Sequence, residues 1–266
     1  MTIPSCTVQL PMYDWPEIHA ANDRLWQCIH DALKTRGIKS PSALDRASEP
    51  ESAWRSDELL LSQTCGLPLV TSLADRAQVV GSFAYRDTES PGLYHSLLIA
   101  REDSPDLLTG FKGKRVAING LDSYSGCLAL KCMLCDDAFG DGFFSELHIS
   151  GGHRQSVEMV ARNEADIAAI DCVSWALARR FDEEAKRVRV IARAPSRPNL
   201  PLITSKQAKT QDLELIQEAI AEAIEALDSA TSEATGIVGF LSRERTDYKS
   251  IRSDVDRAGS IRLALR

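Results

Sequence analysis

The sequence predicts an α/β protein built as two lobes, each a mostly parallel sheet flanked by helices. Short apolar runs typical of buried strands alternate with amphipathic stretches at helical spacing, which indicates βα units. Two extended segments, near residues 94–103 and 193–203, separate two series of such units. With 266 residues and 44% hydrophobic content, each lobe is able to bury a core of its own.

The first series begins with a strand over Cys6–Met12 and a long helix over Pro16–Arg36, which Gly37 ends. A loop is expected over residues 38–57, where prolines and mixed charges interrupt both periodicities. The remaining elements of this series are a strand over Leu59–Ser62, a helix over Leu67–Asp75, a strand over Val79–Phe83 and a long strand over Tyr94–Arg101.

The second series alternates more regularly, and this regularity is what predicts parallel strands. Its strands are expected over Arg115–Asn119, Glu146–Ile149, Ile167–Asp171 and Arg187–Ala192, and its helices over Tyr124–Asp136, Arg154–Asn163 and Val173–Arg180. Residues 194–201 hold three prolines in eight residues, so they form an extended crossover, and a helix follows over Leu213–Leu227. The predicted lobes are therefore residues 1–95 with 200–266, and residues 96–199, with a ligand cleft between them.

The most informative motif is the junction Asn119–Gly126, which joins an apolar strand to a helix. The first N–H groups of a helix have no intrahelical partner and carry partial positive charge, so such a junction can hold an anion. Ser123 and Ser125 can add hydroxyl donors, and Gly126 lets a ligand approach the backbone. A second interpretation is that Asp122 or Ser123 simply caps the helix.

Composition excludes several classes of function. A net charge of −7 argues against nucleic acid as a partner, since a phosphate backbone attracts a basic surface. No apolar run approaches the ~18–20 residues that span a bilayer, so no membrane insertion is expected. Met1–Cys6 lacks the basic flank and apolar core of a signal peptide, which predicts a cytoplasmic chain as given, or a periplasmic one if it is a processed form.

No cofactor or metal is predicted. Seven cysteines are an odd number at irregular spacing, which indicates reduced thiols rather than a disulfide framework. Cys132 and Cys135 form a C-x-x-C motif within a helix, but no second pair of ligands lies near them in the sequence. Cys65 is interpreted as a small buried side chain, with a reactive thiol as the alternative. Dinucleotide, nucleotide-triphosphate and zinc-protease motifs are missing from the sequence.

Six motifs together resemble one family, the phosphate, phosphite and phosphonate-binding proteins of ABC transporters, which have a type II periplasmic-binding-protein fold. The resemblance covers nearly the whole chain. The motifs are, in order, Leu10–Asp14, Gln63–Leu69, Pro91–Ser96, Asn119–Gly126, Gly151–Ser156 and Ala168–Trp175.

The resemblance implies a set of ligand contacts. Ser123, Tyr124, Ser125 and Gly126 match the helix start that holds phosphonate oxygens in that family. The other implied contacts are His153 as a further donor, Asp171 as a partner for an amino group of the ligand, Tyr13 and Tyr94 as aromatic side chains from the first lobe, and Gln63, Thr64 and Ser96 from the matching motifs.

Each of these contacts also has a structural interpretation. His153 and Asp171 are candidates for helix caps, and Tyr13 and Tyr94 for core or rim aromatic residues.

The resemblance implies a non-catalytic protein that binds a small oxyanion-bearing ligand, of the phosphonate, phosphate or phosphite class, with an ABC permease as a further partner. The alternative is a cytoplasmic enzyme on the same fold, of the menaquinone- or thiamin-precursor type, which acts on a small carboxylate or phosphate metabolite. For that class the sequence offers His153 and Asp171 as an acid/base pair.

Overall fold

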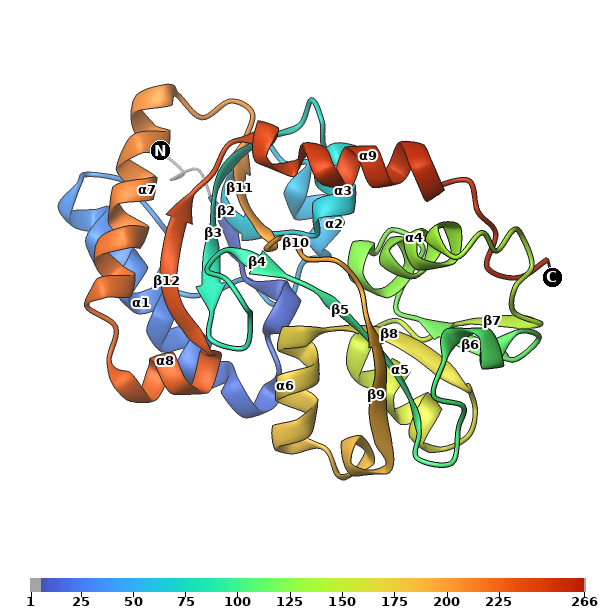
Figure 1. Ribbon diagram of the computed structural model, residues 1–266. Coiled ribbons are helices and arrows are strands. Elements are labelled where there is room, and N and C mark those ends of the chain that lie inside the picture. Colours follow the sequence, from blue (N-terminus) through green and yellow to red (C-terminus); the bar gives the residue numbers. More distant parts are fainter. Residues whose placement is uncertain (1–5, 266) are drawn as a thin grey trace. The chain divides into compact units, whose positions relative to one another are not determined.

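The computed structural model describes residues 6–265, and these form two compact units (Figure 1). One unit comprises residues up to Leu93 with Pro198–Lys249, and the other Tyr94–Arg197 with the residues from Ser250 onward. Met1–Ser5, on which the signal-peptide expectation mainly rests, lie outside the described residues. The α/β class expected from the sequence is confirmed, with helices flanking a five-stranded sheet in each unit.

The first unit is built around a sheet in the order β1-β2-β11-β3-β12. Helix α1 buries Leu25, Trp26, Ile29 and Leu33 at helical spacing, and it packs with α7 and α8 beside the sheet. The elements are β1 (Thr7–Gln9), η1 (Pro11–Tyr13), η2 (Pro16–Ile18), α1 (His19–Thr35), α2 (Pro50–Trp54), β2 (Leu59–Gln63), α3 (Gly66–Val70), β3 (Ala77–Tyr85), β11 (Pro201–Ser205), α7 (Thr210–Glu225), α8 (Ser229–Thr235), β12 (Ile237–Ser242) and η6 (Arg245–Tyr248).

The second unit has a sheet in the order β7-β6-β8-β5-β9, and α5 and α6 pack on its strands. Its core includes Leu98, Val116, Leu130 and Phe144. The elements are β5 (Ser96–Arg101), η3 (Leu108–Phe111), β6 (Arg115–Ile118), η4 (Tyr124–Leu128), α4 (Ala129–Asp136), β7 (Glu146–Ile149), α5 (His153–Ala161), β8 (Ile167–Asp171), α6 (Cys172–Phe181), η5 (Glu183–Arg187), β9 (Val188–Arg193) and α9 (Lys249–Ala258); a separate ribbon pairs β4 (Leu93–Tyr94) with β10 (Arg197–Pro198).

The expectation of mostly parallel sheets was wrong. In the first unit β1 and β2 are parallel, but β11 is antiparallel to both β2 and β3, and β12 is antiparallel to β3. In the second unit β6 is parallel to β7 and β8, whereas β5 is antiparallel to β8 and β9. The reason is connectivity: helical crossovers join β6, β7 and β8 in one direction, whereas β5 and β11 each follow an extended crossing, which does not impose that direction.

Several element boundaries also differ from the expectation. Residues 38–57 contain the short helix α2, the helix expected over Leu67–Asp75 is confined to α3, and the strand expected over Tyr94–Arg101 is divided between β4 and β5. The helix expected over Tyr124–Asp136 begins with a π-helical turn. Short elements and irregular turns carry little periodicity, so the sequence signal for them is weak.

The C-terminal segment lies in the second unit, not in the first as expected. The Asp254 carboxylate on α9 accepts hydrogen bonds from Arg197 at 2.6 and 2.9 Å and from Tyr124 at 2.8 Å. Leu263 joins the core of the second unit, and Ala264 forms a β-bridge with Phe144. The chain therefore passes between the units a third time, after Lys249, and chain order alone did not reveal this.

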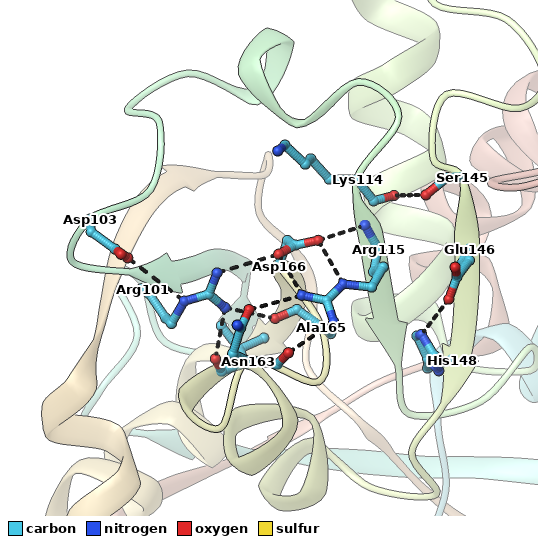
Figure 2. Close-up of polar contacts among 11 residues, drawn as sticks. Arg101, Asp103, Lys114, Arg115, Ser145, Glu146, His148, Asn163, Ala165 and Asp166 are labelled. Carbon is cyan, nitrogen blue, oxygen red and sulfur yellow. Dashed lines mark hydrogen bonds and ion pairs between the residues drawn. The ribbon is translucent and has the colours of Figure 1, made fainter.

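A partly buried carboxylate joins the ends of three strands of the second unit, β6, β8 and β5 (Figure 2). Asp166, just before β8, accepts hydrogen bonds from Arg115 at 2.9 and 3.0 Å and from Arg101 at 3.3 Å. Arg115 begins β6 and Arg101 ends the antiparallel β5, so both reach Asp166. Burial acts to raise the pKa of Asp166, but the hydrogen bonds from the two arginines outweigh it and lower the pKa to about 2.

We predict that Asp166→Asn lowers the free energy of unfolding by about 2 kcal/mol at pH 7. The folded-state pKa lies below the unfolded value of about 3.9, so this stabilisation is present above pH ~4 and is lost as the pH falls towards 2. The difference between wild type and variant, measured by urea unfolding, should therefore shrink between pH 7 and pH 3. Equal stabilities at pH 7 would contradict this role for Asp166.

Candidate functional site

The candidate site lies at the start of the helix that follows β6, where the first turn is wider than an α-helical turn. Leu128 N–H donates to the Ser123 carbonyl at 3.1 Å, and Ala129 N–H donates to the Tyr124 carbonyl, each across five residues. The Ser123 hydroxyl oxygen accepts from Gly126 N–H at 3.0 Å. Ser123 is therefore an N-cap, as the structural interpretation of this motif expected.

Glycine is required at position 126 because the backbone there lies close to other groups. A Cβ at Gly126 would clash with the side-chain oxygen of Asn119 and would lie 3.2 Å from Cε1 of His153. The loop after β7 approaches as well, since Gly151 N–H donates to the Asn119 carbonyl at 3.1 Å. The turns after β6 and β7 therefore form one surface around Gly126.

A chain of polar contacts joins this turn to the ends of two further elements. Ser125 Oγ lies 2.9 Å from His153 Nε2, and the same nitrogen lies 3.2 Å from Asp171 Oδ2. The other oxygen, Asp171 Oδ1, accepts from Val173 N–H at 3.0 Å and Ser174 N–H at 2.9 Å, so Asp171 also caps α6. Ser125 and Asp171 are buried, and the His153 side chain is only 12% exposed.

His153 is neutral near pH 7 in this environment. Burial lowers its pKa, and the negative charge of Asp171, with the Ala169 backbone, only partly opposes that effect. We assign the ring proton to Nε2, because a lone pair on that nitrogen would face the Asp171 carboxylate. Ser125 Oγ then lies beside an N–H donor, and its own hydrogen is available for another acceptor.

This arrangement is suited to binding an anion rather than to activating a nucleophile. In a serine–histidine–aspartate relay the serine and the carboxylate contact different ring nitrogens, whereas Ser125 and Asp171 both contact Nε2 of His153. What the turn offers is the Ser125 hydroxyl and backbone N–H groups at a helix start. These are donors for the oxygen atoms of a small anion.

Three other residues expected at the site lie in the same unit. The Tyr124 hydroxyl donates to Asp254, so its side chain is committed to α9. Tyr94 is buried with its ring centroid 6.3 Å from that of Tyr124, and it belongs to the second unit, not to the first as expected. Ser96 pairs with Asp171 across β5 and β8, and its buried hydroxyl has no partner among the described residues.

The remaining expected residues lie in the first unit, and two of them, Tyr13 and Gln63, contact Tyr85, a residue that sequence reasoning missed. The Tyr13 ring meets the Tyr85 ring edge to face, with centroids 5.3 Å apart, and Gln63 donates to the Tyr85 hydroxyl at 3.0 Å. Thr64 is fully buried, and its N–H donates to the Pro201 carbonyl at 3.0 Å. Tyr85 stands at the end of a long strand with no motif around it, so the sequence held no signal for it.

The sequence comparison identifies the family. Residues 43–248 match the family described as ABC transporter, phosphonate, periplasmic substrate-binding protein. The chain belongs to this family. The match spans most of the chain, including all of the candidate site except the residues before position 43. No curated protein matches the sequence.

Solved structures show the same fold at low sequence identity. XAC2383 from Xanthomonas citri, bound to chloride, aligns at TM-score 0.75 and 14% identity, covering 97% of this chain and 99% of its own. PhnD1 from Prochlorococcus marinus, in complex with methylphosphonate, aligns at TM-score 0.75 and 15% identity, covering 97% and 100%. The ABC phosphonate transporter component PA3383 from Pseudomonas aeruginosa aligns at TM-score 0.72 and 16% identity, covering 94% and 84%. The periplasmic-binding-protein fold expected from the sequence is thus confirmed.

Three further observations concern thiols, metal ligands and membrane-spanning helices among the described residues. All seven cysteines, including Cys132 and Cys135, are free thiols. Within residues 6–265 no group of three or more His, Cys, Asp or Glu side chains is placed to hold a metal ion. In the same residues, no helix is long and apolar enough to cross a membrane.

We predict that the His153 imidazole titrates below the ordinary histidine pKa of about 6.5 in NMR spectra of the ligand-free protein. The pKa of His153 is lower in the folded chain than in the unfolded chain. Between these two pKa values the unfolded chain binds a proton at His153 and the folded chain does not. His153 should therefore make the protein less stable as the pH falls below ~6.5. A midpoint at or above 6.5 would contradict a buried, neutral His153.

Proposed function

We propose that this chain binds the oxyanion group of a small phosphonate, phosphite or phosphate ligand at the turn Ser123–Gly126, as the substrate-binding component of an ABC transporter. Family membership supports the transport role. The site is supported by the series of buried contacts that joins Ser125, His153 and Asp171 beside Gly126. These contacts leave the Ser125 hydroxyl hydrogen available to a ligand at the helix start. A permease partner and a periplasmic location follow from the same family and belong to the proposal.

Each group at the turn has a separate part in the proposed binding. The Ser125 hydroxyl and the backbone N–H groups of the first turn donate to ligand oxygens. Gly126 leaves room for the Asn119 side chain against the turn, and His153 orients Ser125. The side chains of Ser123 and Tyr124 are already bonded within the protein, so we assign these two residues a role through the backbone.

We assign the ligand class from the chemistry of these donors. The donors at the turn, which are the Ser125 hydroxyl, the His153 ring and backbone N–H groups, are neutral. The charged group beside them, Asp171, is shielded by His153 and by two backbone amides. Such a site binds small oxyanions through directed hydrogen bonds rather than through ion pairs. Methylphosphonate, the ligand in the PhnD1 structure, is the first probe, followed by phosphite and inorganic phosphate.

We predict that Ser125→Ala weakens the binding of methylphosphonate by roughly ten- to a hundredfold, measured by isothermal titration calorimetry. The variant removes a donor to a charged group, a contact worth about 1.5–3 kcal/mol. Ser232→Ala is the matched control, because it removes a hydroxyl bonded at 2.7 Å to the Ile237 carbonyl in the first unit. The control should leave the dissociation constant unchanged.

Two results would count against the proposed site. If the wild-type protein binds none of the three oxyanions, the ligand class is wrong. If it binds one of them and Ser125→Ala binds equally well, the turn serves only as a capped helix start.

A further inference from the structure

One residue of the π-helical turn is tied to a part of the chain that the family match does not include. Tyr124 is the first residue of this turn, between Ser123 and Ser125, and its buried hydroxyl donates to Asp254 at 2.8 Å. Asp254 lies on α9, beyond residues 43–248. The contact is therefore a feature of this chain that membership of the family does not imply.

Asp254 is held firmly at the centre of a buried charge cluster. Arg197 donates to both of its oxygens, at 2.6 and 2.9 Å, and Arg257 donates to one of them at 3.1 Å. The Asp254 side chain is only 4% exposed. Burial acts to raise its pKa, but hydrogen bonds from Arg197 and Tyr124 lower it, so the group is an ionised, fixed acceptor at neutral pH.

The turn needs such an anchor because of its geometry. A π-helical turn holds one residue more than an α-helical turn between bonded groups, is rare, and often occurs at functional sites. Tyr124 provides the carbonyl that accepts from Ala129 N–H, so its position decides the width of the turn. A shift of Tyr124 would rotate Ser125 away from His153, since Ser125 is the next residue in the chain.

We infer that Asp254 is a positioning residue for the anion site: through the Tyr124 hydroxyl it keeps the turn wide and Ser125 directed towards His153. Asp254 touches neither Ser125 nor the ligand position, and it acts through Tyr124. The inference rests on the proposed function for its binding consequence, but its effect on the turn can be measured without ligand.

Hydrogen exchange of the ligand-free protein tests the anchor. In Tyr124→Phe and in Asp254→Asn, the amides of Leu128 and Ala129 should exchange at least about tenfold faster than in wild type, because a hydrogen bond to a charged group is lost at the turn. Amides of the central strand β6 should change far less.

Asp166→Asn is the matched control for Asp254→Asn. Asp166 is a partly buried carboxylate that likewise holds two arginines in the same unit, but at the opposite ends of β6 and β8 (Figure 2). In this variant, the exchange of the Leu128 and Ala129 amides should accelerate, relative to wild type, by no more than the exchange of the β6 amides. Tyr248→Phe controls for Tyr124→Phe, since the buried Tyr248 hydroxyl donates to the Asn199 carbonyl in the first unit at 3.0 Å.

The binding test uses methylphosphonate. Tyr124→Phe and Asp254→Asn should each raise its dissociation constant about tenfold, as expected for residues that orient a direct contact. The double variant should bind no more weakly than Tyr124→Phe alone, because Asp254 acts only through Tyr124. Additive losses in the double variant would overturn the inference.

The two proposals fail in different ways. Wild-type protein that binds no oxyanion, or a Ser125→Ala variant that binds normally, overturns the proposed function. Binding that depends on Ser125 but is the same in Tyr124→Phe and wild type overturns the positioning role alone. Turn amides that accelerate no more than the β6 amides of the same variant, in Asp254→Asn as in Asp166→Asn, overturn it as well, with or without a ligand.

Discussion

The candidate site depends on the contact between His153 Nε2 and Asp171 Oδ2. This contact fixes the ring proton on one nitrogen, and that proton leaves the Ser125 hydrogen free to be donated. The same carboxylate caps α6 with its other oxygen, so the side chain cannot turn away from the imidazole. In the proposed function, this neutral donor set is in place before the ligand binds, which reduces the reorganisation that binding requires.

The second unit uses two further carboxylates in a similar way, the buried Asp254 and the partly buried Asp166, each as a fixed acceptor for several donors. Asp166 holds the ends of three strands, and Asp254 holds α9 to the crossing residue Arg197 and to Tyr124. Each is paired with arginine, which avoids the penalty of an uncompensated buried charge. The strand ends and the candidate binding turn are thus fixed by separate clusters. Loss of one cluster need not disturb the part of the unit that the other cluster fixes.

Local pattern in the sequence indicated the turn at Ser123–Gly126, whereas His153 and Asp171 were expected from the resemblance to the family. Strand-to-helix junctions place Ser125, His153 and Asp171 after strands that run in the same direction, and such residues meet at one edge of a sheet. The π-helical turn could not be predicted because it is short and has no periodic signal, and the Tyr124–Asp254 contact could not be predicted because it joins residues 130 positions apart. Strand direction was missed for a similar reason, since an extended crossing does not fix the direction of the next strand.

A crystal structure of the protein with methylphosphonate tests the central claim most directly. The account predicts phosphonate oxygens within hydrogen-bonding distance of Ser125 Oγ and of backbone N–H groups at the helix start, about 2.7–3.2 Å, with the His153–Asp171 contact retained. A phosphonate group bound elsewhere, with Ser125 still bonded only to His153, would contradict it.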